Sequence, residues 1–295
     1  MYNIIGHRKI FFIISGVICG CSILALIFWG LKPGIDFTGG SLMEIKYSTN
    51  KPANSEIVQQ LSPLNLGEIN IQTIGQNSFV LRFKEINEDT HQAVLKALGN
   101  NAEESKFESI GPIIGGELVR KSQWAVILAL MAMFLYIAWA FRKLANFSRQ
   151  GEYWRYSSGA IVALLHNVLV MCGFFAVWSH FKGVEINANF ITAILTVLGY
   201  SINDTIVVFD RIRENVLLYG TRSMEETINK SINEIIVRSL NTGMAVILAL
   251  IAIYLFGGVS LQDFAIAMIV GISVGTYSSI AIASPFLLLF RKTQK

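Results

Sequence analysis

An acidic residue lies inside one of the most apolar stretches of the sequence. Asp204 follows an apolar run that begins near Phe190, and it comes about six residues before the charged pair Asp210–Arg211. A charge near the centre of a membrane helix costs roughly 2.5–3.5 kcal/mol on insertion scales, and such residues are functional by default. Because removal from water favours the neutral acid, a carboxyl at this depth can bind and release a proton. Asp204 is therefore the first candidate for a proton-binding residue.

Polar residues accompany Asp204 at helical spacing. Tyr200 stands four residues before Asp204, one turn away on the same face, and Asn203 directly precedes it. Both are further candidates for a proton relay. The alternative is a structural aspartate that only bonds to a neighbouring helix. The polar stripe along this predicted helix consists of Thr192, Thr196, Gly199, Asn203 and Asp210.

Two residues on other predicted helices complete the candidate relay. Arg238 begins a later apolar helix and is the natural counter-charge for Asp204, provided that the two helices pack side by side. Alternatively, Arg238 is an arginine that extends its charge to the membrane surface. His166 lies near the middle of another predicted helix, with Asn167 beside it. A single histidine in a helix is more often a packing or hydrogen-bonding group than a proton carrier.

The sequence lacks the residue patterns of a hydrolase, an ATPase or a metalloenzyme. It contains no Ser-His-Asp set, metal-ligand spacing or dinucleotide fingerprint, and its four histidines are widely dispersed. The glycine pair in PGIDFTGGS (33–41) is not followed by the GK[ST] of a phosphate loop. The three cysteines lie in predicted helices, so no disulfide framework is indicated. We expect no enzyme, no metal and no cofactor, with H⁺ as the coupling ion and Na⁺ as the alternative.

The elements that must position these residues are membrane helices. Of the 295 residues, 53% are hydrophobic and only 15% are charged, which indicates a polytopic α-helical membrane protein rather than a soluble domain. A membrane span needs roughly 20 mostly apolar residues. Six segments qualify, at about 10–30, 123–141, 157–180, 189–209, 239–257 and 264–290.

The distribution of lysine and arginine predicts the orientation of these spans. Nearly all basic residues of the short connections and of the chain ends fall on one side, whereas Lys182 alone falls on the other. By the positive-inside rule, both the N-terminus and the C-terminus are expected to be cytoplasmic. The net charge of +4 follows from this topology and does not indicate binding of nucleic acid.

A segment between the first and second spans is not apolar and predicts a small outer α/β domain. Its strands and helices follow the order β-α-β-β-α-β, which is typical of a ferredoxin-like unit. The chain then divides into the first helix (1–31), this outer domain (32–122) and a bundle of the remaining helices (123–295). The expected strands are 41–48, a hairpin within 69–84, and 107–111; the expected helices are 54–64 and 88–99.

Two further helical features stand out in the last third of the sequence. The charged stretch 211–238 predicts a helix on the cytoplasmic surface, with Thr221 or Ser223 as its N-cap. The last span carries a small residue at every fourth position, a pattern that favours close helix packing. These small residues are Ala267, Gly271, Gly275, Ser279 and Ala283.

Four motifs together resemble the SecF family, the smaller membrane subunits of the bacterial SecDF complex, which are related to the RND transporters. They are GIDFTGGSLMEI after the first helix, LTVLGYSINDTIVVFDRIREN around Asp204, SINEIIVRSLNTG around Arg238, and YLFGG. The resemblance covers the whole chain and implies one helix, an outer domain and five more helices, the arrangement of an RND-type half-unit. The signature residues of the first motif are Gly34, Asp36, Phe37, Thr38, Gly39 and Gly40.

The resemblance also implies a function. Such a subunit works in the inner membrane with SecD and the SecYEG channel, and uses the proton-motive force to help an unfolded polypeptide across late in export. It implies that Asp204 and Arg238 match the family's helix-four carboxylate and helix-five arginine. One position departs from the family pattern, because helix three usually reads His-Asp-Val whereas this chain has His166–Asn167–Val168. An asparagine cannot titrate, so His166 lacks the partner that the family pattern provides.

Two other classes of function stay open at the level of the sequence. The first is a half-unit of an RND-type small-molecule exporter, which would need a larger outer domain with an apolar pocket for a drug-sized molecule. The second is a structural scaffold of a membrane complex, for which the titration of Asp204 would be dispensable. Replacement of Asp204 by asparagine separates the scaffold from a proton-coupled subunit.

Overall fold

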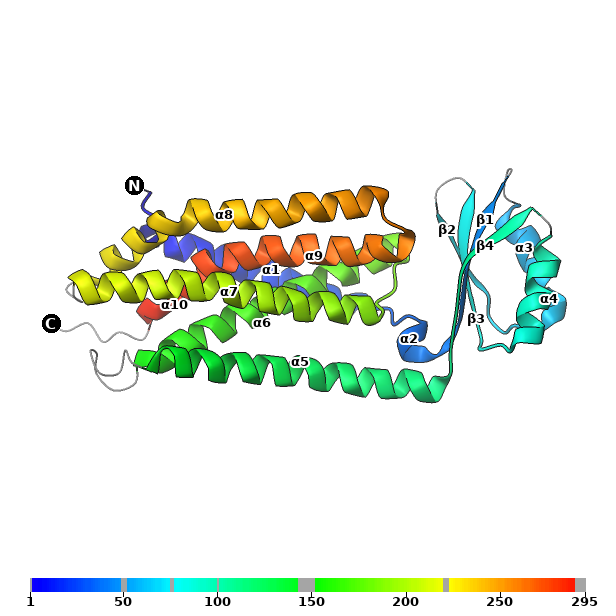
Figure 1. The fold of residues 1–295 in the computed structure, drawn as a ribbon, viewed down its shortest axis with the longest axis horizontal. Helices are drawn as coiled ribbons and strands as arrows, with labels where there is room; N and C mark the ends of the chain where they lie inside the picture. Colours follow the sequence, from blue (N-terminus) through cyan, green and yellow to red (C-terminus); the bar gives the residue numbers. More distant parts are fainter. Residues whose placement is uncertain are drawn as a thin grey trace. The chain divides into compact units, whose positions relative to one another are not determined.

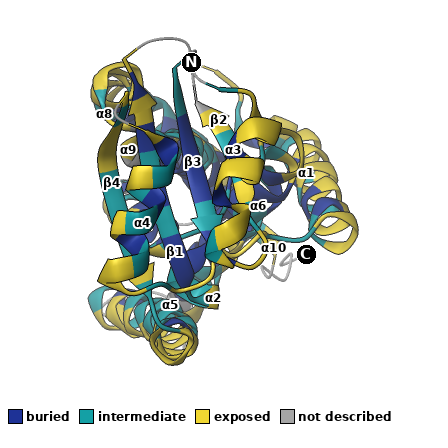
Figure 2. Cartoon of the chain, turned by 90° about the vertical axis from the view of Figure 1, so that its right-hand side faces the viewer, coloured by how far each residue is buried: buried dark blue, intermediate teal, exposed yellow. Residues whose placement is uncertain are grey.

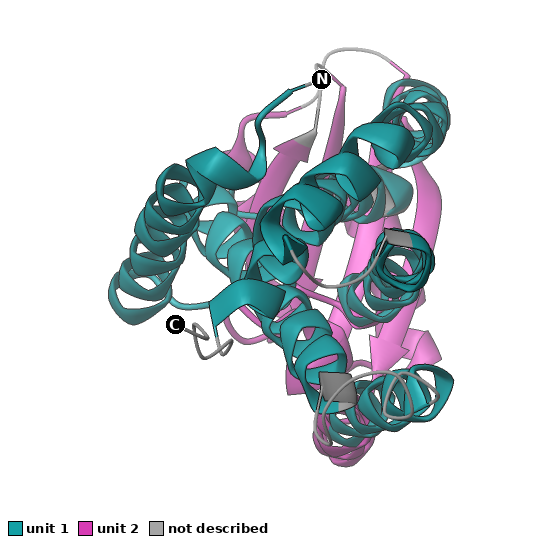
Figure 3. Cartoon of the chain, turned by 90° about the vertical axis from the view of Figure 1, so that its left-hand side faces the viewer, with its two compact units in different colours: residues 1–31, 124–184, 189–295 teal, residues 32–123, 185–188 magenta. Residues whose placement is uncertain are grey.

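The computed structural model of the chain consists of two compact units, coloured separately in Figure 3. The helical unit comprises residues 1–31, 124–184 and 189–295, and the sheet unit comprises residues 32–123 and 185–188. The short segment 185–188 therefore belongs to the sheet unit, although it lies between two long helices in the sequence. The structure describes residues 2–48, 52–74, 77–99, 101–142, 152–219 and 223–289.

Six helices among the described residues are long and apolar enough to cross a membrane, so the chain is a polytopic helical membrane protein (Figure 1). Each overlaps one predicted span, and most extend beyond it because polar residues at the ends continue the helix. They are α1 (Arg8–Phe28), α5 (Pro112–Ala140), α6 (Glu152–Lys182), α7 (Ala188–Tyr219), α8 (Met224–Phe256) and α9 (Val259–Ser278), which continues through a π-helical turn (Ser279–Ala283) into α10 (Ser284–Leu289).

The charged stretch 211–238 is divided between two helices, so the prediction of one separate surface helix is wrong. α7 continues to Tyr219, and α8 begins at Met224. The predicted cap at Ser223 is confirmed, because its hydroxyl accepts a hydrogen bond from the backbone N–H of Glu226. A side-chain oxygen at this position satisfies one of the N–H groups that have no partner at the start of a helix.

Ion pairs fasten the end of α7 to the beginning of α8. Arg211 of α7 lies 2.6 Å from Glu234 of α8 and 2.6 Å from Glu214 of its own helix. Asn215 donates a second hydrogen bond of 2.8 Å to the Glu234 carboxylate. The charged residues of this region therefore hold two membrane helices side by side. Thr221, the other candidate cap, lies outside the described residues.

Small residues allow α9 to approach α6 and α7 closely. A Cβ atom at Gly271 would overlap the side chain of Val197 and lie 2.8 Å from the sulfur of Met171. A Cβ atom at Gly275 would lie 3.1 Å from the Cβ of Ser201. Larger side chains at these two glycines would push the helices apart, which places the small-residue face of the last span at a helix–helix contact.

The sheet unit contains a four-stranded antiparallel sheet with the order β2-β3-β1-β4. The elements of this unit follow one another as β-α-β-β-α-β, the order that the sequence predicts. They are α2 (Ile35–Thr38), β1 (Gly40–Tyr47), α3 (Asn54–Leu61), a 3₁₀ turn (Ser62–Leu64), β2 (Asn70–Ile74), β3 (Ser78–Phe83), α4 (Glu88–Leu98) and β4 (Ala102–Ile110).

The strand β4 begins earlier than the predicted strand 107–111. Its first half carries Glu103, Glu104 and Lys106, which hide the alternation of apolar residues expected for a half-buried strand. Pairing with β1 determines the boundary instead, because Tyr47 of β1 lies opposite Ala102. The start of this strand is therefore set by a partner strand distant in sequence.

The core of the sheet unit lies between the sheet and its two helices. α3 and α4 cover one face of the sheet, and the residues between them are buried (Figure 2). Alternate residues of β1 and β3 point into this core because side chains in a strand alternate between the two faces. The core residues are Met43, Ile45 and Tyr47 of β1, Phe79, Leu81 and Phe83 of β3, Ile57 and Leu61 of α3, and Val94 and Leu98 of α4, with Leu66 beside them.

Candidate functional site

Asp204 is buried in the helical unit, and both oxygens of its carboxylate accept a hydrogen bond. Oδ1 accepts from the hydroxyl of Ser239 at 2.7 Å, and Oδ2 accepts from the hydroxyl of Ser279 at 2.6 Å. Only 8% of the surface of Asp204 is exposed. The two serines come from α8 and from the π-helical turn, so one carboxylate of α7 joins three parts of the bundle. A serine hydroxyl can both donate and accept a hydrogen bond, so the two serines are versatile partners for this side chain.

The π-helical turn brings Ser279 to the carboxylate. Ser284 donates to the backbone oxygen of Ser279 at 2.8 Å, and the Ser279 hydroxyl also lies 3.0 Å from the backbone oxygen of Thr276. Turns of this kind are rare inside α-helices and are frequently found at functional sites. Ser279, which the sequence pattern assigned to helix packing, therefore also contacts the candidate proton-binding residue.

The structure places Ser239, rather than Arg238, against Asp204. α7 and α8 do pack side by side, as the expected pairing requires. Successive residues of a helix point about 100° apart, so a helix that directs Ser239 at the carboxylate directs Arg238 elsewhere. Arg238 is exposed, and no ion pair joins it to Asp204 among the described residues. The direct ion pair expected from the sequence is therefore not formed in this structure.

Polar residues next to the site are exposed on the surface of the helical unit. Asn203 directly precedes Asp204, and Asn241 follows Arg238 by one turn. Asn203, Arg238 and Asn241 are exposed, whereas Asp204 is buried. Exposed polar groups at membrane depth are unfavourable against lipid and normally face protein or a water-filled space. Thr192, Thr196 and Gly199 continue this exposed stripe along α7.

Tyr200 lies near the site from another side. A Cβ atom at Gly243 of α8 would lie 3.7 Å from the Tyr200 hydroxyl and 3.0 Å from the hydroxyl of Thr276. This glycine therefore lets side chains of α7 and α9 approach each other. The Thr276 hydroxyl is buried and has no hydrogen-bond partner among the described residues. It lines an apolar pocket of about 420 Å³ between α1, α8 and α9.

His166 and Asn167 form a separate contact between α6 and α7. The Asn167 amide donates to the Ser201 hydroxyl at 2.8 Å, and Nδ1 of His166 lies 3.2 Å from the Asn167 side-chain oxygen. Both residues are buried. Among the described residues, no hydrogen bond continues from His166 to Asp204, so this pair is a neighbour of the site rather than a part of it.

The glycine-rich motif of the sequence forms a tight junction within the sheet unit. Gly39 and Gly40 have φ angles of +76° and +127°, which residues other than glycine rarely adopt. A Cβ atom at Gly39 would lie 2.7 Å from Cα of Pro112, at the start of α5. Thr38 donates to the backbone oxygen of Gly34 at 3.1 Å and closes the turn.

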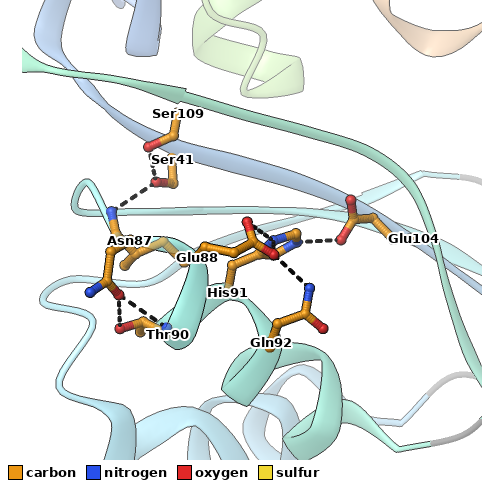
Figure 4. Close-up of polar contacts among 9 residues, drawn as sticks. Ser41, Asn87, Glu88, Thr90, His91, Gln92, Glu104 and Ser109 are labelled. Carbon is orange, nitrogen blue, oxygen red and sulfur yellow. Dashed lines mark hydrogen bonds and ion pairs between the residues drawn. The ribbon is translucent and has the colours of Figure 1, made fainter.

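A second polar cluster, within the sheet unit, centres on His91 (Figure 4). Its Nε2 lies 2.6 Å from Glu104 of β4, its Nδ1 lies 3.2 Å from Glu88 of α4, and its ring stacks on Phe107 with centroids 3.9 Å apart. Burial alone would lower the pKa of His91, but the hydrogen bonds to Glu104 and Glu88 outweigh it and raise the pKa above its usual value.

Two further sets of polar contacts lie near the beginning of α4. Asn87 caps α4 by accepting hydrogen bonds from the backbone and the hydroxyl of Thr90. The Ser41 hydroxyl lies 2.8 Å from the Ser109 hydroxyl and accepts from the backbone N–H of Ile86. Glu88 and His91 have the i,i+3 spacing of one helix face, but no local pattern in the sequence indicates that Glu104 joins them. Strand alternation places Glu104 on the helix-covered face only once the pairing of β4 is known.

Fold and site together place the chain among the polytopic helical membrane proteins in which a small four-stranded unit separates the first two spans. Comparison with known proteins narrows this class to one family. The family "Protein export membrane protein SecD/SecF, C-terminal" matches residues 90–293, and the "SecD/SecF GG Motif" family matches residues 25–51. The chain belongs to the SecF family.

Individual relatives agree with this assignment. The chain is 38% identical to the protein translocase subunit SecF of Anaerolinea thermophila, over 98% of this chain and 94% of the relative. It is 40% identical to the SecF of Thermobaculum terrenum, over 100% of this chain and 98% of the relative. The crystal structure of SecDF from Thermus thermophilus, described as a translocon-associated membrane protein, superposes with a TM-score of 0.83 at 30% identity. That match covers 97% of this chain and 38% of the SecDF chain.

Proposed function

We propose that this protein is an accessory subunit of the Sec export machinery that works with SecD and couples the proton-motive force to the late stage of polypeptide translocation. The observation that carries the proposal is the buried carboxylate of Asp204, held by hydroxyls of α8 and of the π-helical turn. Membership of the SecF family supports the export role, and SecD, SecYEG and a translocating unfolded polypeptide are its proposed partners.

Proton binding at Asp204 would change the packing of the bundle. The ionised carboxylate accepts from both Ser239 and Ser279, whereas the neutral acid is a weaker acceptor and carries a proton of its own. Hydrogen bonds to charged groups contribute roughly 1.5–3 kcal/mol each. A membrane potential of 100 mV supplies ~2.3 kcal/mol per elementary charge, which is the same order of magnitude. One proton therefore suffices to shift a switch of a few kcal/mol.

Arg238 would supply the positive charge of this switch. Its exposure next to Asn203 and Asn241 supports a surface that SecD covers in the assembled complex, because an arginine at membrane depth needs a polar or charged partner. In another state of the cycle Arg238 would pair with Asp204 directly, since the two residues lie on adjacent helices. Tyr200 would serve as a neighbouring relay group, and His166 would have a structural role.

The sheet unit would be a ferredoxin-like domain on the outer face of the bacterial inner membrane, with both chain ends in the cytoplasm. The antiparallel order β2-β3-β1-β4 with two helices on one face supports this topology. We propose that this domain holds the emerging polypeptide transiently. The proposed coupling ion is H⁺ rather than Na⁺, because the groups around the carboxylate are hydroxyl donors that already serve it as hydrogen-bond partners.

Replacement of Asp204 by asparagine tests the proposal, because it preserves size and polarity but removes titration. We expect the variant, assembled with SecD in proteoliposomes with SecYEG, to lose the stimulation of translocation by a proton gradient and to keep translocation without one. An undiminished stimulation would contradict proton coupling and favour the structural scaffold. An RND-type small-molecule exporter would instead lose efflux of small molecules and leave translocation unchanged.

A further inference from the structure

The connection between α6 and α7 is bound to the sheet unit through its backbone. Gly34 donates to the backbone oxygen of Ile186 at 2.7 Å, and Ile186 donates to the backbone oxygen of Lys32 at 2.8 Å. These bonds form a short parallel bridge between Pro33 and Ile186. The segment 185–188 is thereby fixed to the glycine-rich motif that precedes β1.

A side chain of that motif caps the helix that carries the candidate proton site. The carboxylate of Asp36 accepts a hydrogen bond of 2.6 Å from the backbone N–H of Ala188, the first residue of α7. A carboxylate at this position satisfies a free N–H group and favours the positive end of the helix dipole. Asp204 lies 16 residues further along the same helix, about 24 Å at 1.5 Å per residue.

An ion pair attaches the same connection to the sheet. Oε2 of Glu185 lies 2.9 Å from Nε of Arg82 on β3, and only 18% and 16% of the two side chains are exposed. Arg82 also donates to the side-chain oxygen of Gln72 on β2 at 2.9 Å. Burial raises the pKa of Glu185, and the positive charges of Arg82 and Lys32 oppose that rise. Because this pair is largely shielded from water, removing one partner is expected to be more damaging than removing one partner of an exposed pair.

The start of α5 is held at the same junction. A Cβ atom at Gly115 would lie 3.0 Å from the backbone oxygen of Phe37 and 3.0 Å from the backbone nitrogen of Gly39. Gly40 approaches the backbone oxygen of Phe83, the last residue of β3. The junction therefore joins the first residues of two membrane helices, α5 and α7, to the ends of β1 and β3. Close backbone contact makes such a junction stiff.

We infer that Asp36 and Glu185 are positioning residues that pass movement of α7 to the sheet unit. The contacts Asp36–Ala188 and Arg82–Glu185 are called the clasp below. The inference rests on the proposed function, because the movement in question is the one that protonation of Asp204 would cause. Both contacts lie within the sheet unit and attach the first residue of α7 and the residues before it to α2 and β3, so a displacement of that residue would act directly on these two elements.

The test uses the full chain assembled with SecD in proteoliposomes and measures two signals. A fluorophore on Val58→Cys, an exposed position of α3, reports the response of the sheet unit to an imposed proton gradient, in a background without the three native cysteines. The infrared carboxyl band that is absent from Asp204→Asn reports proton binding itself. The variants are Asp36→Ala, Asp36→Asn and Glu185→Gln, with Asp89→Ala as an exposed acidic control on the sheet unit.

We expect Asp36→Ala and Glu185→Gln to reduce the fluorophore response at least about five-fold, which is the lower limit of a typical coupling between two sites. The carboxyl band should persist in both variants. Asp36→Asn keeps an acceptor for the Ala188 N–H and should retain most of the response, as should Asp89→Ala. The double charge reversal of Arg82→Glu with Glu185→Arg should restore part of what each single change removes.

Four results would overturn the inference. An undiminished response in Asp36→Ala and Glu185→Gln would show that the clasp transmits nothing. Loss of the carboxyl band together with the response would show that the clasp only maintains the fold. Failure of Asp36→Asn to behave better than Asp36→Ala would exclude the helix cap as the reason. A normal fluorophore response in Asp204→Asn would contradict the proposed function, and the inference that rests on it would be wrong as well.

Discussion

The hydroxyl of Ser239 on α8 lies 2.7 Å from Oδ1 of Asp204 on α7. This bond crosses between two membrane helices at a residue directly beside Arg238, which is exposed. A neutral donor and a positive charge therefore occupy adjacent positions of one helix. A rotation of α8 about its axis would exchange one for the other, which gives the proposed switch a simple geometric form.

Ser239→Ala should impair proton-driven translocation. The change removes the donor to Oδ1, and a hydrogen bond to a charged group contributes roughly 1.5–3 kcal/mol, so the stimulated rate should fall about ten-fold or more. Ser239→Thr keeps the hydroxyl and should retain most of the stimulation. Ser273→Ala is the matched control, because the exposed Ser273 hydroxyl donates to the backbone oxygen of Ile269 in its own helix. A rate for Ser239→Ala equal to that of this control would refute the role of the bond.

Arg238→Gln should reduce proton-driven translocation without loosening the bundle. Arg238 is exposed in the isolated chain, so the free energy of unfolding should change by less than about 0.5 kcal/mol. The charge itself is nonetheless required for the proposed switch, and Arg238→Lys should preserve more of the stimulation than Arg238→Gln. Translocation assays and thermal unfolding in detergent measure the two effects separately. A large loss of stability with normal translocation would contradict the prediction.

Gly271→Ala should destabilise the packing of α9 against α6 and α7. The added Cβ would overlap Val197, and overpacking of a tight contact typically costs about 1–3 kcal/mol. Gly20→Ala is the control, since nothing lies within 4 Å of a Cβ added there. Thermal unfolding of both variants in detergent should show a lower midpoint for Gly271→Ala only. Equal midpoints would mean that the helices separate at little cost.

The attachment of α4 to β4 should depend on pH through His91. The pKa of His91 is raised in the folded protein, so the stabilisation is fully present below the ordinary histidine value of 6.5 and is lost as the pH rises through the raised pKa. Hydrogen exchange of the α4 amides should therefore quicken across that range, beyond the intrinsic pH dependence. His91→Gln should abolish the extra dependence, whereas His180→Gln should leave it unchanged. A persistent dependence in His91→Gln would assign it to another group.

Much of the helical unit could be predicted from composition alone. Runs of about 20 apolar residues have few alternatives to membrane helices, and each of the six predicted spans overlaps a long apolar helix of the structure. Their ends were less certain, because residues such as Arg211 and Glu214 continue α7 well past its apolar part. Asp204 was identified for the same reason as the spans, since a carboxylate among apolar residues is conspicuous in any sequence.

The partners of Asp204 could not be predicted in the same way. Ser239 and Ser279 are small, uncharged residues that fit a packing role equally well, and only the helix rotation decides that they point at the carboxylate. The sequence favours Arg238 as the partner, because it shows the charge of a residue but not the direction of its side chain. Contacts such as Glu185 with Arg82 join residues about a hundred positions apart, and no local pattern signals them.

The π-helical turn at Ser279–Ala283 holds one residue more than an α-helix needs to cover the same rotation. Loss of a single codon there, such as that of Ile282, should therefore restore an uninterrupted α-helix. Ser284 and Leu287, both buried, would keep their orientation, because the deleted residue is the one that the wider turn absorbs. The deletion would instead act on the turn itself, which holds the Ser279 hydroxyl against Asp204. A shortened last span is thus expected to spare the C-terminal end of the bundle and to disturb the buried carboxylate.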